Sequence, residues 1–314
     1  MRFNVVVARC MLLSLMLVML FSTACATRNK EVARDYYNLG TGYLDAKNYV
    51  RAREYYERAL DLDPSLAQAS YNLARVYLLI DRVDEAIDIL QDLLRRDADN
   101  LMVRETLAYA WSAQGEWQRS ADIMEAVVDD NDVSARGWLN YSITLLEIDR
   151  FQAAGQAADK ALLLQPDNES ARFVKVIAVA YSTPDDLVDL EGQLGELYAK
   201  APSRRLVIEL GDALETAGRF DLALDLYTAT VEKYDDDGEL SFRRARILIE
   251  VVDDRSAGVD ALVRALSKGM KEDERLLALV SQVEDELPAG VLGDEGDDGA
   301  AGAADSAVSG GQQQ

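Results

Sequence analysis

The residue types that most often carry catalysis are almost absent from this chain. Its 314 residues contain no histidine, so the commonest general base, the commonest metal ligand and the usual pH switch are missing. The two cysteines, Cys10 and Cys25, both lie near the start, and the remainder of the chain can form no disulfide. Ser/His/Asp and Cys/His catalysis and histidine-ligated zinc are therefore excluded within this chain. With no nucleophile motif visible, we expect no enzymatic activity, no cofactor and no metal.

The thiol of Cys25 stands at the end of a segment typical of bacterial export signals. Arg2 and Arg9 precede an apolar run over residues 10–21 that is interrupted only by Ser14. A run of this length spans only about 18 Å as a helix, which is short for a membrane crossing of about 20 residues. We therefore expect residues 1–24 to be a signal peptide.

The four residues that follow the apolar run resemble the lipobox of bacterial lipoproteins. They read Ser22-Thr23-Ala24-Cys25, with Ser22 in place of the usual aliphatic residue. The resemblance implies cleavage before Cys25 and attachment of a diacylglycerol to its thiol, with palmitate among the acyl chains of the lipoprotein. The alternatives are cleavage after Ala24 or Ala26 without lipid, or an uncleaved anchor.

If the lipid is present, Ala26 in place of Asp implies an anchor in the outer membrane that faces the periplasm, by resemblance to lipoprotein sorting. Three acyl chains would hold the protein stably, because each buried methylene adds about 0.8 kcal/mol. Residues 25–32 are then a lipidated linker.

A pattern of large and small residues at fixed spacing begins at Ala33. Its fourth, seventh, eighth and eleventh positions share one face of an expected helix, and its twentieth, twenty-fourth and twenty-seventh share one face of a second. Small residues allow the two helices to approach closely, large ones fill the gaps, and a proline ends the second helix. The residues at these positions are Tyr36, Leu39, Gly40, Tyr43, Ala52, Tyr56, Ala59 and, at position 32, Pro64.

These eight positions resemble the signature of the tetratricopeptide repeat. The pattern returns about every 34 residues, from Ala67, Leu101 and Ala135. The resemblance implies an all-α fold, a right-handed superhelix (α-solenoid) of about six to seven helix-turn-helix repeats.

The fifth repeat, from Glu169, is irregular. Arg172 and Lys175 stand where apolar residues are expected, Thr183-Pro184-Asp185 interrupts the middle, and Pro202 arrives two residues late. We expect its second helix at about residues 186–199. Its apolar residues Phe173, Val174, Ile177 and Tyr181 are either core or a binding patch.

The C-terminal third restores the pattern and then ends it. A sixth repeat is marked by Leu210, Gly211, Leu214, Ala223 and Tyr227, and a weaker seventh by Ala245, Leu248, Leu262 and Ala265. We expect repeats one to five over 33–200, repeats six and seven with a capping helix (273–287) over 203–287, and a disordered acidic Gly/Ala tail over 288–314.

In tetratricopeptide arrays the first helices of successive repeats line a concave groove, and by resemblance positions 2, 5, 6, 9, 12 and 13 point into it. Asparagine recurs at position 6 and tyrosine at position 5, so an Asn ladder could bind the backbone of an extended peptide or of a helix. The alternative is that Asn is tolerated on a solvated helix face. The peptide-groove residues that we predict are Tyr37, Asn38, Tyr71, Asn72, Arg75, Tyr109 and Asn140. The same positions also hold Met102, Glu105, Thr106 and Arg136.

Acidic residues are abundant, and the net charge is −23. This charge repels nucleic acid and favours a partner with a basic surface, or it serves solubility alone. The clusters 129–132 and 235–239 lack the spacing of a calcium loop, and we expect them to cap helices.

These features favour a non-catalytic scaffold for protein–protein interaction, a lipid-anchored adaptor that binds other envelope proteins in its groove. The alternatives are a lipoprotein subunit of a periplasmic solute-uptake system and a pilotin-like secretion factor. The sequence identifies neither the partner nor the oligomeric state.

Overall fold

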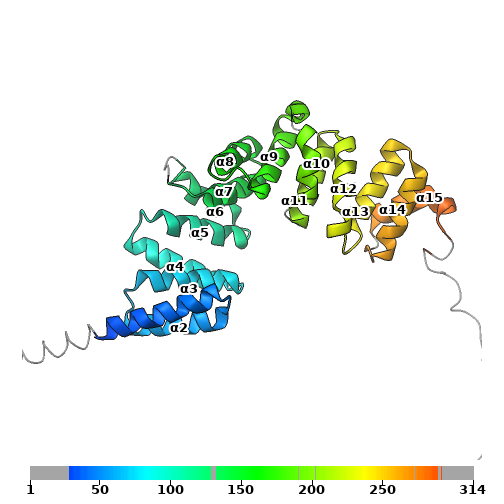
Figure 1. The fold of residues 1–314 in the computed structure, drawn as a ribbon. Coiled ribbons are helices and arrows are strands. Elements are labelled where there is room, and N and C mark those ends of the chain that lie inside the picture. Colours follow the sequence, from blue (N-terminus) through cyan, green and yellow to red (C-terminus); the bar gives the residue numbers. More distant parts are fainter. Residues whose placement is uncertain are drawn as a thin grey trace, which may run out of the picture. The chain divides into compact units, whose positions relative to one another are not determined.

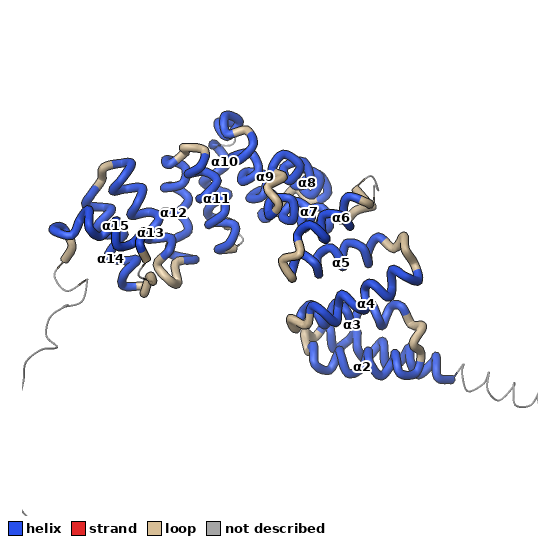
Figure 2. Tube along the Cα trace, turned by 180° about the vertical axis from the view of Figure 1, so that it is seen from behind, coloured by secondary structure: helices blue, strands red, loops and turns tan. Residues whose placement is uncertain are grey.

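The computed structural model describes residues 28–288, apart from 129–131, 190, 202 and 272, together with residue 291. All regular elements in these ranges are helices, and they are joined by short loops (Figures 1 and 2). The chain divides into two compact units, Met1–Glu191 and Gly192–Gln314. The division falls within the fifth repeat, the one whose pattern is irregular.

Unit 1 is a succession of helix pairs. A first helix over residues 28–45 precedes α2, and each later pair starts near the residue expected from the repeat. Neighbouring helices along the chain pack together, and α3, α5, α7 and α9 also contact one another in sequence. The bounds are α2 Tyr49–Leu62, α3 Ala67–Leu79, α4 Val83–Arg96, α5 Leu101–Ala113, α6 Trp117–Glu125, α7 Ala135–Glu147, α8 Phe151–Leu164 and α9 Glu169–Ser182.

The turn between the two helices of a repeat uses the same backbone conformation at the same place. Position 15 of five repeats has a positive φ, between 57° and 79°. Gly115 and Gly218 adopt this conformation without steric cost, whereas aspartate or lysine adopts it elsewhere. A left-handed residue at this point ends one helix and reverses the chain into the next. The residues concerned are Lys47, Asp81, Gly115, Asp149 and Gly218.

The core of each repeat is built from the positions that the pattern predicts. Ala52 and Ala59 are fully buried on α2, and the Tyr56 ring between them is also fully buried. The corresponding Ala86 and Leu90 of α4 are buried in the same way. Close helix approach through small residues therefore positions the first helices side by side.

Leu39, at position 7 of the first repeat, departs from this burial. Its side chain is 48% exposed, whereas the equivalent Leu73 of the second repeat is 5% exposed. No described helix precedes the one that carries Leu39.

The fifth repeat breaks at Pro184. Its position 15 is Thr183, whose φ is −143°, negative where five other repeats have a positive value. A residue that precedes proline is pushed toward extended backbone, so the regular turn is not available here. A 3₁₀ helix, Pro184–Asp189, replaces the turn. Helix α10 follows at Glu191–Ala199, so it ends where expected but begins later than the expected 186. Phe173, Val174 and Ile177 are fully buried, which favours core over a binding patch.

Unit 2 continues the pairs and contains one register shift. The π-helix Leu248–Val252 follows α13 directly, and the left-handed residue comes at Asp253. Counted from Gly238, which places Ala245 at position 8, Asp253 falls at position 16 and Leu262 at position 25. A π-helical turn carries one extra residue, which explains the shift of one. The other bounds are α11 Arg204–Thr216, α12 Phe220–Tyr234, α13 Glu239–Ile247 and α14 Arg255–Ser267.

The last helix is shorter than the sequence indicated. Helix α15 spans Glu274–Val283 and ends in a 3₁₀ turn, Glu284–Glu286. It buries Leu276, Leu279 and Val283 against the seventh repeat, as a cap does. The expected tail lies outside the described residues, except for residues 288 and 291.

Candidate functional site

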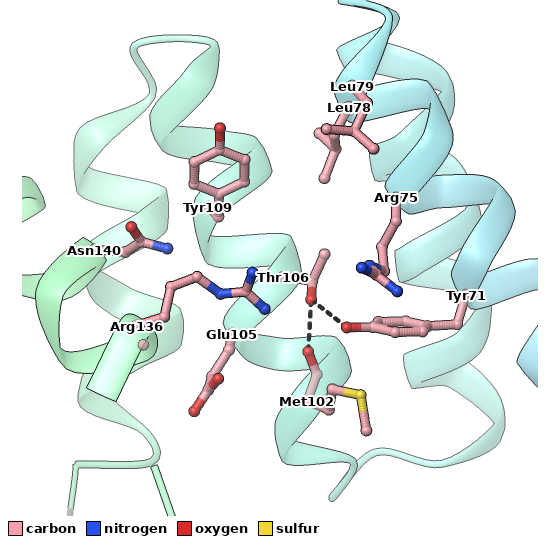
Figure 3. Close-up of a pocket in the computed structure, with 11 residues that line it drawn as sticks. Tyr71, Arg75, Leu78, Leu79, Met102, Glu105, Thr106, Tyr109, Arg136 and Asn140 are labelled. Carbon is pink, nitrogen blue, oxygen red and sulfur yellow. Dashed lines mark hydrogen bonds between the residues drawn. The ribbon is translucent and has the colours of Figure 1, made fainter. Parts of the chain in front are cut away.

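A pocket of about 270 Å³ opens between the first helices of the second, third and fourth repeats. It is small for a whole ligand, and its size suits a few side chains of a bound segment. Helices α3, α5 and α7 contribute its walls (Figure 3). The lining residues are Tyr71, Arg75, Leu78, Leu79, Met102, Glu105, Thr106, Tyr109, Arg136, Gly137 and Asn140.

The repeat register explains which side chains line this pocket. Ten of the eleven lining residues occupy positions 2, 5, 6, 9, 12 or 13 of their repeats, and Gly137 occupies position 3. Because α3 contacts α5 and α5 contacts α7, these positions meet on one surface. The residues packed between the helices thus fix the geometry of the pocket, although they do not line it.

Thr106 lies at the centre of the pocket and is fully engaged (Figure 3). Its hydroxyl donates to the carbonyl of Met102 at 2.8 Å and lies 3.0 Å from the Tyr71 hydroxyl. Since a hydroxyl carries one hydrogen, Tyr71 is the donor in the second bond. Neither hydroxyl has a hydrogen left for a ligand.

Two arginines approach Thr106 from opposite sides. Figure 3 shows the guanidinium groups of Arg75, from α3, and Arg136, from α7, both directed toward the middle of the pocket. Arg75 lies 5.9 Å from the centre of the Tyr71 ring and donates to the Asn72 side-chain oxygen at 3.2 Å. These groups supply the positive charge of the pocket.

The one acid of the pocket is held away from these arginines. Each of the two Glu105 oxygens accepts a hydrogen bond from Ser134, one from its backbone N–H and one from its hydroxyl, both at 2.7 Å. Ser134 in turn caps α7 by accepting from the Gly137 N–H at 2.9 Å. A Cβ at Gly137 would come within 2.7 Å of the Glu105 carboxyl, so glycine permits this close approach.

The predicted groove residues are only partly brought together. Tyr71, Arg75, Tyr109 and Asn140 line the pocket. Four further residues line the pocket: Met102, Glu105, Thr106 and Arg136. Their repeat positions indicated the groove, but they were not among the peptide-groove residues that we predicted. Leu78 and Leu79 were missed, although positions 12 and 13 would have indicated them.

The Asn ladder is not uniform. Asn72 is buried, and its amide donates to the Tyr37 hydroxyl at 3.4 Å, so both polar atoms of its side chain are engaged. Asn38 is exposed on the first helix, and neither it nor Tyr37 lines the pocket. Asn140 alone of the three presents its amide there (Figure 3).

The acidic segment at 235–239 caps a helix. Asp235 accepts hydrogen bonds from the backbone N–H groups of Leu240 and Ser241, at 3.0 and 3.2 Å, and from the Ser241 hydroxyl. The described residues contain no group of three or more acids, cysteines or histidines placed to hold a metal. Most of the other acidic cluster, 129–131, lies outside the described residues.

A polar network around the buried Tyr227 links α11, α12 and α13 of unit 2. Burial, together with the charge of Glu215, raises the pKa of Tyr227 well above its usual range. The Tyr227 hydroxyl donates to Glu215 at 2.8 Å, and Arg243 pairs with Asp212 and Glu239. Each group has its partner within the repeat pair, so the network has a packing role.

The expected signal peptide and Cys25 lie outside the described residues. Within the described residues, no helix combines the length and apolar character that a bilayer crossing requires.

Comparison with known families finds tetratricopeptide repeat models along most of the helical region. One matches residues 43–109, and a second matches 106–171 and 193–251, which together cover more than half of the chain. Residues 172–192, between the matches, include the irregular part of the fifth repeat.

Two curated proteins resemble part of the chain. An uncharacterised lipoprotein of Treponema pallidum is 27% identical over 155 residues, which is 49% of this chain and 79% of that protein. The human mitochondrial import receptor subunit TOM70 is 22% identical over 136 residues, 41% of this chain and 22% of that protein.

Two solved structures share the fold. A tetratricopeptide repeat protein of Parabacteroides merdae has a TM-score of 0.55 at 15% identity, over 81% of this chain and 99% of that one. Pseudomonas aeruginosa pilF has a TM-score of 0.51 at 18% identity, with the same coverage. At these identities the likeness concerns the fold alone.

Proposed function

Because the chain belongs to the tetratricopeptide repeat family, we propose that it is a non-catalytic adaptor that binds segments of other proteins in the pocket on α3, α5 and α7. Tetratricopeptide repeats indicate a scaffold for protein–protein interaction, and stacked repeats offer extended surfaces for it. The observation that carries the proposal is the pocket itself, where ten lining residues fall at groove positions of three successive repeats.

The surface of the pocket supports protein binding more than catalysis. Large apolar side chains are exposed there, Met102 at 58%, next to tyrosine and arginine, the residue types enriched at interfaces. The whole chain has no histidine, and the pocket holds no cysteine. An import receptor subunit among the relatives also supports a protein-binding role.

We place this adaptor in a bacterial cell envelope, anchored by lipid on Cys25. Two observations support the anchor: the export signal that ends in Ser22-Thr23-Ala24-Cys25, and a relative that is named a lipoprotein. The outer membrane facing the periplasm is the location that the residue after Cys25 favours.

Filling the pocket tests the adaptor function. We expect Asn140→Trp to abolish capture of a partner from solubilised membranes while leaving the helical circular dichroism unchanged. The matched control is Leu163→Trp, because Leu163 lies on α8, outside the pocket, and is 77% exposed. A partner captured equally by both variants would remove the pocket from the function. The identity of a captured protein, for example a solute-binding or a secretion protein, would decide between the pathways.

Metabolic labelling with palmitate tests the anchor. We expect label on the native protein and on Cys10→Ser, and none on Cys25→Ser. Label that persists on Cys25→Ser, or no label on the native protein, would contradict lipidation at this residue.

A further inference from the structure

Arg75 and Arg136 line the pocket without an ion-pair partner. In the described part of unit 1, Arg34, Arg58 and Arg172 also form no ion pair, but those three do not line the pocket.

The chain carries 56 acidic residues against 33 basic ones. Most arginines of the second helices α2, α4 and α6 pair with a nearby carboxylate, and on the first helices Arg104 pairs with Asp99. Arg51 pairs with Glu54, and Arg95 with Asp92, each at 3.0 Å. Within the described part of the chain, no ion pair is formed by Arg75 or Arg136, although both face the same pocket.

The acidic residue of the pocket forms no ion pair with Arg75 or Arg136. Glu105 lines the same pocket, but both of its oxygens bind Ser134, and in Figure 3 its carboxyl points away from the two guanidinium groups. The Tyr71 hydroxyl donates its hydrogen to Thr106, and the Thr106 hydroxyl donates its own to the Met102 carbonyl. The guanidinium groups are therefore the main donors that remain in the middle of the pocket.

Apolar side chains lie on both sides of this charged centre. Figure 3 shows Leu78, Leu79 and Tyr109 beyond one side of it and Met102 beyond the other. Leu79, Met102 and Tyr109 are exposed, so each has apolar surface that a bound segment could cover.

We propose that the pocket binds a side-chain carboxylate, from an aspartate or glutamate within an extended partner segment, between Arg75 and Arg136, with apolar residues of the same segment on both sides. This assignment rests on the proposed adaptor function and names the chemistry of its partner. A guanidinium group suits a carboxylate because it can donate two parallel hydrogen bonds.

The position of the two arginines favours binding of an acidic residue inside the partner segment over binding of the C-terminal carboxylate of the partner. A C-terminal carboxylate bound at the centre would end the segment there and leave the apolar side chains on one side uncovered. The net charge of −23 also repels a segment with many acids, so the partner segment carries one carboxylate among neutral or basic residues.

Three immobilised peptide libraries test this assignment against the full-length purified protein. The first has glutamate at the centre, apolar residues at the flanking positions, neutral residues elsewhere and an amide at the C-terminus. The second replaces that glutamate by glutamine. The third ends in a free carboxylate at the central position and lacks the residues beyond it.

We expect the glutamate library to retain at least ten times more protein than the glutamine library. Arg136→Gln, which removes no hydrogen bond recorded within the described chain, and Arg75→Gln/Arg136→Gln should abolish that preference. The control is Arg51→Gln/Arg95→Gln, which removes two positive charges from the second helices α2 and α4 and should leave the preference intact. Circular dichroism establishes that each variant is folded.

Equal retention on the glutamate and glutamine libraries, or no retention on either, would overturn the assignment. So would a preference that survives Arg75→Gln/Arg136→Gln, or stronger retention on the free-carboxylate library. The carboxylate assignment can fail without the proposed function. Equal retention on both amide libraries that is lost in Asn140→Trp would preserve the adaptor function and remove only the carboxylate assignment.

Discussion

Gly40 lies against the ring of Tyr56 so closely that a Cβ on residue 40 would be 2.8 Å from Cδ1 of that ring. The ring cannot easily move, because Tyr56 is fully buried and its hydroxyl lies 3.1 Å from the Thr41 hydroxyl. The same relationship recurs in the sixth repeat between Gly211 and Tyr227. Close contact of a small position 8 with a large position 24 is therefore what sets the spacing of the two helices in these repeats.

We expect Gly40→Ala to be less stable than Gly42→Ala by about 1–3 kcal/mol, the usual range for overpacking. Both glycines are in the helix 28–45, so both substitutions gain the same helix propensity of about 1 kcal/mol. A Cβ at Gly42 would meet no atom within 4 Å, so the difference isolates the contact with Tyr56. Urea unfolding measures it, and equal midpoints for the two variants would contradict the packing described here.

The cap of α13 gives a second prediction. We expect Asp235→Ala to destabilise the protein by about 1–3 kcal/mol, because it leaves the buried N–H groups of Leu240 and Ser241 without their acceptor. Asp236→Ala, at the exposed neighbouring position, should change the free energy of unfolding by less than about 0.5 kcal/mol. If the two substitutions had similar effects on urea unfolding, Asp235 would not be the cap.

The three asparagines at position 6 should behave differently from one another. Asn72→Ala should lower the free energy of unfolding by about 1 kcal/mol, since it removes the bonds to Tyr37 and Arg75. Asn140→Ala should weaken partner binding without that loss, and exposed Asn38→Ala should affect neither. Thermal unfolding and affinity capture of all three variants test these differences. An equal loss of partner binding in the three variants would instead indicate that every asparagine contacts the ligand.

Stability should be almost independent of pH between about 5.5 and 8.5, because the chain has no histidine. The hydrogen bond from Arg219 lowers the pKa of Asp221, and the N–H of Leu276, with Arg275, lowers the pKa of Asp273. Because the pKa of each carboxyl is lower in the folded protein than in the unfolded chain, both carboxylates stabilise the fold at pH values above the unfolded pKa of about 4. This stabilisation is lost as the pH falls through the folded pKa values. Urea midpoints at intervals from pH 2 to 8 measure this, and a transition near pH 6.5 would be inconsistent with it.

At alkaline pH we expect the opposite trend: the free energy of unfolding falls as the pH rises. Burial raises the pKa of Tyr227 and of Tyr56, so their contribution is complete below the unfolded pKa of about 10 and is lost as the pH rises above it. We expect Tyr227→Phe to lose less stability than the native protein between pH 9 and 11.5. The same loss in both proteins would show that Tyr227 does not contribute.

The repeat register could be predicted from sequence because it depends on residue size at fixed intervals. Gly40, Ala52 and Tyr56 identify a helix crossing wherever they recur, and Thr183-Pro184 identifies the place where the regular turn is lost. The shift of one residue at the π-helix Leu248–Val252 could not be predicted, because no residue type there signals it.

The chemistry of the pocket was less predictable than the fold. Asn72 and Asn140 share a repeat position and a residue type. Asn72 is nevertheless buried and hydrogen-bonded to Tyr37 and Arg75, whereas Asn140 faces the pocket. Arg136 was assigned to the groove by its position, but its lack of an ion pair depends on Ser134 binding Glu105, which only the folded α5–α7 contact creates.

Photo-cross-linking in intact cells tests whether the protein binds its partner in the pocket on α3, α5 and α7. Benzoylphenylalanine would replace Met102, which lines the pocket, or Leu163, which is exposed on α8 outside it. We expect a discrete cross-linked product from position 102 that disappears with Asn140→Trp, and no such product from position 163. A product from position 163 alone, or one from position 102 that survives Asn140→Trp, would contradict partner binding in this pocket.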